Sequence, residues 1–128
     1  MKKITVAATQ MTCSWNLEEN LQKAEALIRR AVAAGAQIVL IQELFQAPYF
    51  CIEQHASHLA LAAGLGESKV VQRMARLAAE LGVVLPVSWF ERAGNAFFNS
   101  IAMVDADGSI LGVYRKSHIP NAIGYQEK

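Results

Sequence analysis

An unbroken apolar run at residues 38–41 is followed almost directly by the carboxylate of Glu43. The run reads Ile-Val-Leu-Ile, which favours a strand covered on both faces, over residues 37–42. In an open α/β sheet, ligands bind beyond the carboxyl ends of such strands. Glu43 is therefore predicted to project into a functional edge of a sheet. From position alone, an ordinary surface glutamate that pairs with a basic residue is the alternative.

Strand-like and helical periodicities alternate along the chain. Strands are predicted at residues 3–10, 37–42, 83–90, 97–105 and about 109–114. One helix is expected to begin after Asn16 and to end at Gly35, and a second covers about 67–81 and ends at Gly82. The order β-α-β-α-β-β-β predicts an α/β fold with a mixed sheet, in which two right-handed β-α-β units precede a hairpin at 105–108.

The bulk properties of the chain exclude several classes of protein. The net charge is +1 and no basic stripe is visible, so no nucleic-acid partner is expected. No segment approaches the ~20 apolar residues that cross a bilayer, and the first ten residues do not resemble a signal peptide. We therefore expect a cytoplasmic protein without a membrane partner. The hydrophobic fraction of 53% is high for a free-standing domain of 128 residues, so further chain or a partner subunit is expected to cover part of it.

Lys116 is the second candidate site residue, because it follows the strand-like run 110–114. A glutamate and a lysine at one edge of a sheet supply a base and a cation, which are two parts of a catalytic site. Alternation along the strand places Arg115 and Lys116 on opposite faces, so at most one of them readily faces a given site. The alternative for Lys116 is also an ordinary surface position.

Histidines and cysteines give weaker signals. The i, i+3 spacing of His55 and His58 suits a metal on a helix, but no third ligand follows at zinc-like spacing, which favours ordinary loop histidines. Cys13 and Cys51 are expected to be free thiols in a reducing compartment, and Cys13 to be a packed, inert one. These residues thus predict no metal site.

Four blocks of the sequence carry a resemblance to a known family. They are Val6–Met11, Gln42–Phe45 with Pro48–Phe50, Phe97–Ile101, and Tyr114–Pro120. Taken in this order, they resemble the nitrilase (carbon–nitrogen hydrolase) superfamily over the whole chain. The resemblance implies a four-layer α-β-β-α sandwich with a mixed sheet, of which residues 1–128 form the N-terminal half, as a partial carbon–nitrogen hydrolase domain.

Members of this superfamily use a Glu–Lys–Cys triad. The resemblance implies that Glu43 is the general base, that Lys116 is the cation at the developing oxyanion, and that Glu127 helps to position the substrate and the lysine. The nucleophilic cysteine belongs to a later motif, which neither Cys13 nor Cys51 matches. These 128 residues alone are therefore expected to be inactive.

Within the superfamily, the segments 48–51 and 124–128 favour the branch that hydrolyses N-carbamoylputrescine to putrescine, carbon dioxide and ammonia, in polyamine synthesis from agmatine. That branch implies a small-molecule substrate with a cationic amine tail, no cofactor, and assembly as a homo-oligomer. Two alternatives stay open. One is another amidohydrolase of the superfamily, acting on a ureido acid or an ω-amide. The other is a non-catalytic α/β interaction module that uses its apolar half for docking.

Overall fold

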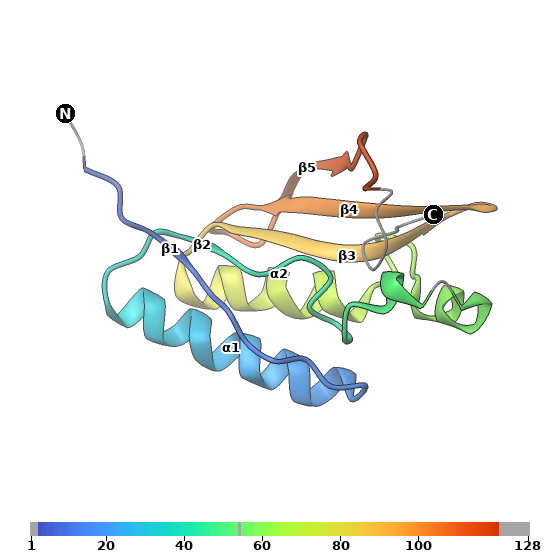
Figure 1. Cartoon of the computed structure of the whole chain (residues 1–128). Coiled ribbons are helices and arrows are strands. Elements are labelled where there is room, and N and C mark those ends of the chain that lie inside the picture. Colours follow the sequence, from blue (N-terminus) through green and yellow to red (C-terminus); the bar gives the residue numbers. More distant parts are fainter. Residues whose placement is uncertain (1–2, 54, 121–128) are drawn as a thin grey trace.

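The computed structural model describes residues 3–53 and 55–120, and it has the mixed α/β architecture that the sequence predicts (Figure 1). The strands are β1 (Val6–Ala8), β2 (Ile38–Leu40), β3 (Leu85–Ala93), β4 (Ala96–Val104) and β5 (Ile110–Arg115). β1 and β2 pair in parallel, whereas β3, β4 and β5 form an antiparallel sheet in that order. A parallel bridge between Ile38 and Val84 joins the two sheets.

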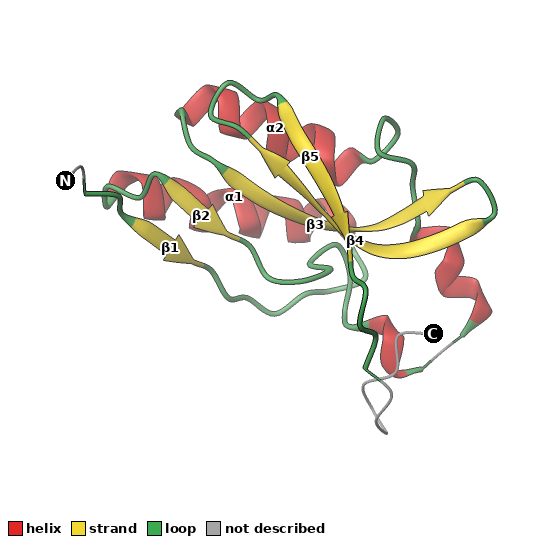
Figure 2. Cartoon of the chain, turned by 90° about the horizontal axis from the view of Figure 1, so that it is seen from above, coloured by secondary structure: helices red, strands yellow, loops and turns green. Residues whose placement is uncertain are grey.

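Two α-helices cover the same face of these strands, as the side view and the view from above both show (Figures 1 and 2). In α1 (Leu17–Ala33), the Asn16 side chain caps the first turn by accepting a hydrogen bond from the backbone N–H of Glu19 (3.2 Å). α2 (Lys69–Leu81) ends at Gly82, whose φ of 62° lies in the left-handed region that glycine adopts readily. Neither helix in the described residues is long and apolar enough to span a membrane.

The hydrophobic core lies between these helices and the sheets. Trp89 of β3 is fully buried, and its indole N–H donates to the carbonyl of Ala63 (3.1 Å), so burial leaves this polar group satisfied. Each fully buried aliphatic side chain contributes about 1.5–3 kcal/mol. The core residues from the helices and strands include Leu21, Ala24, Ile28, Val39, Val70, Val71, Met74, Leu77, Leu85, Val87, Ala102 and Val104.

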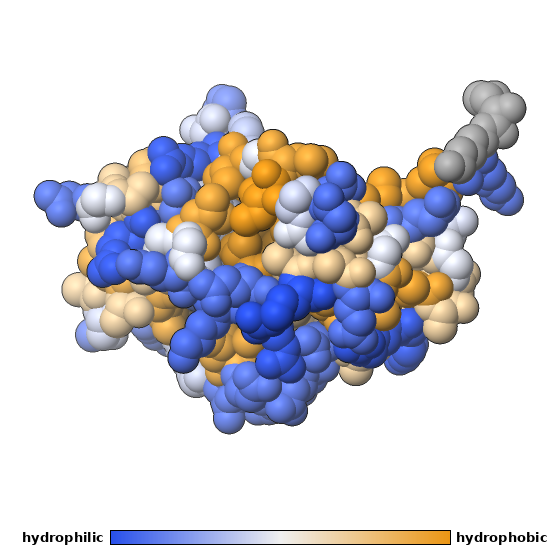
Figure 3. Space-filling view, turned by 180° about the vertical axis from the view of Figure 1, so that it is seen from behind, coloured by the Kyte–Doolittle hydropathy of each residue, from blue (hydrophilic) through white to orange (hydrophobic). Residues whose placement is uncertain are grey.

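The opposite face of the sheets is uncovered, which corrects the prediction that the strand at 37–42 is covered on both faces. Val39 is fully buried, whereas Leu40 is 47% exposed. Successive side chains of a strand point to opposite faces, and the helices cover one face only. The edge strand β5 is exposed along its length. In Figure 3, which views the molecule from behind, apolar side chains gather in the upper part of the molecule, on the side of the strands. Exposed apolar residues of the strands are Val6, Leu40, Phe97, Met103, Ile110, Leu111, Val113 and Tyr114.

The segment 44–66, which the sequence predicts to be irregular, contains two short 3₁₀ helices. They are η1 (Phe50–Ile52) and η2 (Ala56–Leu61). The buried side chain of Gln46 fixes this segment to β3, because its Nε2 donates to the carbonyl of Leu61 (2.9 Å) and its Oε1 accepts from the backbone N–H of Phe90 (3.0 Å). The loop is therefore attached to the sheet beside the strand ends.

Candidate active site

Glu43 and Lys116 form an ion pair at the ends of two different strands. Nζ of Lys116 lies 2.9 Å from Oε1 of Glu43, and the two side chains are 28% and 47% exposed, respectively. Glu43 follows β2 and Lys116 follows β5, so 73 positions of sequence separate the partners. The structure thus brings together the two charged residues that the sequence predicts at strand ends. Glu127 lies outside the described residues.

Asn99 of β4 is a third member of this cluster. Its Nδ2 donates to Oε1 of Glu43 (2.7 Å), the oxygen that also pairs with Lys116. The backbone N–H of Lys116 in turn donates to the carbonyl of Asn99 (2.9 Å). Among the described residues, both of these donors contact Oε1 of Glu43. Sequence reasoning assigned Asn99 no role, although it lies within one of the four matching blocks.

A strained turn sets the direction of the Glu43 side chain. Leu44 has a φ of 50°, a left-handed conformation that costs a residue other than glycine roughly 1–2 kcal/mol. Its backbone N–H donates to Oγ of Ser88 on β3 (3.0 Å), and its buried side chain packs in an apolar cluster with Phe50 and Phe90. The turn therefore sends Leu44 into the interior while Glu43 faces Lys116.

Arg115, the neighbour of Lys116, has a different partner. Its Nε and Nη2 donate to the two carboxylate oxygens of the buried Glu91 (2.9 and 2.8 Å), and its guanidinium lies 4.1 Å from the ring centroid of Phe98. Ser100 also donates to Glu91 (2.6 Å). The hydrogen bond from Arg115 lowers the pKa of Glu91 although burial opposes this shift, so Glu91 is ionised at neutral pH. The predicted separation of Arg115 and Lys116 is confirmed, but the sequence did not identify Glu91.

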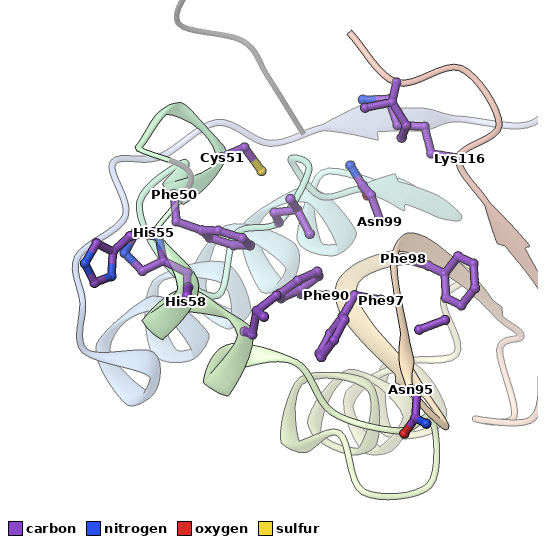
Figure 4. Close-up of a pocket in the computed structure, with 15 residues that line it drawn as sticks. Phe50, Cys51, His55, His58, Phe90, Asn95, Phe97, Phe98, Asn99 and Lys116 are labelled. Carbon is purple, nitrogen blue, oxygen red and sulfur yellow. The ribbon is translucent and has the colours of Figure 1, made fainter. Parts of the chain in front are cut away.

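A pocket of about 510 Å³ opens beside the ion pair (Figure 4). Asn99 and Lys116 line it together with three aromatic rings from the loop, β3 and β4, namely Phe50, Phe90 and Phe97. A second hollow of about 380 Å³ lies on the uncovered face of the sheets, and it is lined by Glu43 together with Asn99 and Lys116, the two residues that it shares with the first pocket. Asn99 and Lys116 therefore face two concave surfaces, and a small molecule held in the first pocket lies beside these two residues.

The two histidines predicted to be ordinary loop residues lie at the far side of the first pocket. Nδ1 of His55 is 2.7 Å from Oγ of Ser57, and the ring of His58 stacks on Trp15 with 5.3 Å between centroids. Among the described residues, no three side chains of the metal-ligating types lie together in a group that holds a metal ion. The two histidine rings pack against each other, and the ring of His58 also packs against Trp15 and Phe50.

The two cysteines are free thiols, and both are half-buried. Sγ of Cys13 accepts a hydrogen bond from Nε2 of Gln42 (3.3 Å), and burial raises the pKa of its thiol. A raised pKa keeps the thiol protonated at neutral pH, which makes Cys13 a poor nucleophile. This agrees with the prediction of a packed, inert thiol. Cys51 lines the 510 Å³ pocket.

The parallel and antiparallel sheets, with a carboxylate, an ammonium group and an amide gathered beside a pocket, define an α/β domain of the hydrolase class. The chain belongs to the carbon-nitrogen hydrolase family, whose sequence pattern matches residues 5–128. It is 50% identical to N-carbamoylputrescine amidase from Arabidopsis thaliana over 127 residues, and this aligned region covers 99% of this chain and 42% of that protein. It is 51% identical over 128 residues to citrullinase from Francisella tularensis, covering 100% of this chain and 45% of that protein.

The fold agrees with this family. The crystal structure of a carbon-nitrogen hydrolase from Helicobacter pylori G27 superposes with a TM-score of 0.89 at 30% sequence identity, covering 97% of this chain and 43% of that one. The prediction of an α/β fold of the nitrilase superfamily is thereby confirmed. The chain spans less than half the length of these relatives.

Proposed function

We propose that residues 1–128 supply the base and the cation of an amidohydrolase that converts N-carbamoylputrescine into putrescine, carbon dioxide and ammonia. The observation that carries this proposal is the convergence of Lys116 and Asn99, which line a pocket, on one oxygen of Glu43. The 50% identity to a relative named for this substrate supports it.

In the first half-reaction, Glu43 accepts the thiol proton of the nucleophilic cysteine that the family resemblance implies. The thiolate attacks the ureido carbonyl carbon, and Lys116 stabilises the oxyanion, a role worth about 2.7–4 kcal/mol for a single donor. Glu43 then returns the proton to the departing amino group, and ammonia leaves. The product is an N-alkyl thiocarbamate on the cysteine, which divides one difficult substitution into two easier steps.

In the second half-reaction, Glu43 removes a proton from water, and the resulting hydroxide attacks the thiocarbamate carbon. The carbon–sulfur bond breaks, and the thiolate recovers its proton from Glu43. The released N-alkyl carbamate decomposes to the free amine and carbon dioxide. Glu127 is assigned by resemblance to positioning the substrate and Lys116, and this role is part of the proposal.

Hydrolysis of citrulline is the second candidate function, and the 51% identity to citrullinase over all 128 residues favours it. The two reactions use the same chemistry, because citrulline and N-carbamoylputrescine both carry a terminal ureido group on an unbranched aliphatic chain. They differ at the other end, where citrulline has a carboxylate beside its amine.

The test is the rate of ammonia release by an enzyme that contains the complete family domain. We expect the highest kcat/KM for N-carbamoylputrescine, a lower one for citrulline, and the lowest for the anionic N-carbamoyl-β-alanine. A Lys116→Ala variant serves as the control for contaminating activity, because it lacks the oxyanion partner. Preference for N-carbamoyl-β-alanine or for an ω-amide would contradict the proposed substrate, and preference for citrulline would select the second candidate.

A further inference from the structure

We propose that an aromatic wall, formed by Phe50, Phe90 and Phe97, binds the polymethylene tail of the substrate. This inference rests on the proposed function and deepens it, because it names the residues that bind the tail of the substrate. The tail begins at the ureido group beside Glu43 and Lys116 and runs along the wall.

The three rings form a continuous apolar surface. The ring centroids of Phe50 and Phe90 are 5.1 Å apart, and those of Phe90 and Phe97 are 5.8 Å apart. All three line the 510 Å³ pocket, which Asn99 and Lys116 also line. In Figure 4, the rings of Phe50 and Phe90 lie between the two histidines and Asn99. A chain that leaves the ion pair through this pocket therefore passes over the aromatic wall.

The second hollow is less suited to a substrate tail. It is lined by Leu40 and Ile101 on the uncovered face of the sheets. In an α-β-β-α sandwich this face packs against another sheet, so we expect protein to cover the apolar part of this hollow, at Leu40 and Ile101. The aromatic pocket is instead built from the loop 44–66 and the strands that the loop contacts, and it lies at the strand ends.

The chemistry of the wall fits an unbranched chain that ends in an amine. The substrates after which the two relatives are named share a terminal ureido group, a run of methylene groups and an ammonium group. Methylene groups gain free energy on burial against aromatic rings, and an ammonium group is attracted to a ring face. Among the described residues that line the pocket there is no carboxylate, so the rings are the features there that favour such a tail.

Phe97 is the member of the wall that gives the clearest test. Phe50 and Phe90 pack with Leu44, the neighbour of Glu43, so truncating either one also disturbs the base. Phe97 lies outside that cluster and is 38% exposed. Ile52 is a matched control, because it is an apolar side chain of η1, is 52% exposed, and does not line the pocket.

The experiment compares N-carbamoylputrescine with methylurea, which has the same ureido group and no tail. In the complete enzyme, Phe97→Ala should lower the ratio of kcat/KM for N-carbamoylputrescine to that for methylurea roughly tenfold, through KM, because tail contacts are lost. Phe97→Leu should keep most of the ratio, and Ile52→Ala should keep all of it. An unchanged ratio in Phe97→Ala would overturn the assignment of the wall.

A binding measurement separates this proposal from the proposed function. Putrescine is titrated calorimetrically into the Glu43→Gln enzyme with and without the Phe97→Ala substitution. Weaker putrescine binding in the double variant supports the aromatic wall, and equal affinity or no binding to either protein overturns it. The absence of ammonia release from every ureido compound by the unsubstituted enzyme counts against the proposed function instead.

Discussion

The side-chain amide of Asn99 and the ammonium group of Lys116 donate to the same oxygen of Glu43, at 2.7 and 2.9 Å. The two donors are also joined through the backbone, because the N–H of Lys116 donates to the carbonyl of Asn99 (2.9 Å). The three residues therefore form a unit that holds one carboxylate oxygen of Glu43 between two donors. Such preorganisation is what a general base needs in order to meet its proton at a fixed position.

Replacing Glu43 with glutamine should separate chemistry from stability. The amide keeps the size of the side chain but accepts no proton, and loss of a general base costs about 10²–10⁴-fold in kcat. Because Glu43 is half exposed, Tm should change little. Ammonia release and thermal melting of the complete enzyme measure the two effects. Near-normal turnover with a lowered Tm would show that this carboxylate is structural.

Asn99→Ala should lower kcat by roughly 10–100-fold with a smaller effect on KM, because a hydrogen bond to a charged group contributes about 1.5–3 kcal/mol. Asn99→Asp should be more harmful, since it sets a second carboxylate against Glu43 and removes the donor. Steady-state kinetics on both variants, with Tm as the check on folding, tests this role. Equal activity of the alanine and aspartate variants would argue against the contact with Glu43.

The pair of Glu91 and Arg115 should make stability depend on pH. The pKa of Glu91 is lowered in the folded protein, so its stabilisation is present above the unfolded value of about 4.3 and is lost as the pH falls through the lowered value. Glu91→Gln should therefore reduce stability by about 1–3 kcal/mol at neutral pH, and by progressively less below about pH 4.

Glu80 supplies the control for this experiment. It forms a comparable ion pair with Arg29, but its side chain is exposed to solvent. Glu80→Gln should leave Tm almost unchanged at every pH, because water and salt screen exposed pairs. If the change in Tm had the same pH dependence in Glu91→Gln as in Glu80→Gln, the role assigned to the buried Glu91 carboxylate would be contradicted.

A side chain at Gly108 should lower the stability of the fold. The φ of Gly108 is 85°, and a Cβ atom built there would lie 2.7 Å from the backbone carbonyl oxygen of Ala75 in α2. Gly108→Ala should cost roughly 1–3 kcal/mol of stability, because it combines a strained φ with a steric clash. Gly66→Ala is the matched control, because a Cβ at Gly66 meets no atom within 4 Å. Chemical denaturation of both variants provides the comparison.

The sequence predicts the parts of this molecule that depend on local pattern. The apolar run before Glu43 and the strand before Lys116 place these two residues at strand ends, and the structure brings them together. The cap at Asn16 and the stop at Gly82 likewise define helix ends from neighbouring residues. The strand ends and helix ends depend on residues that are close together in the sequence, so the pattern of a single sequence is enough to predict them.

The partners of Glu43 and Arg115 depend instead on strand register. Asn99 reaches Glu43, and Glu91 reaches Arg115, because β4 pairs Phe98 with Glu91 on one side and Ser100 with Arg115 on the other. Shifting either pairing by one residue would reverse which side chains share a face. Periodicity indicates that these strands exist but does not specify the register between them. For the same reason, the exposure of Leu40 follows from the position of the helices and not from its apolar neighbours.

The strained turn at Leu44 links two properties of the enzyme that are often treated as separate. Leu44 directly follows the proposed base in the chain, and it packs against two of the three rings of the aromatic wall. A substitution that reshapes the wall at Phe50 or Phe90 therefore also moves the support of the Glu43 carboxylate. Substitutions at those two positions that change substrate preference will therefore also lower turnover. At Phe97, substrate preference can change while turnover is kept.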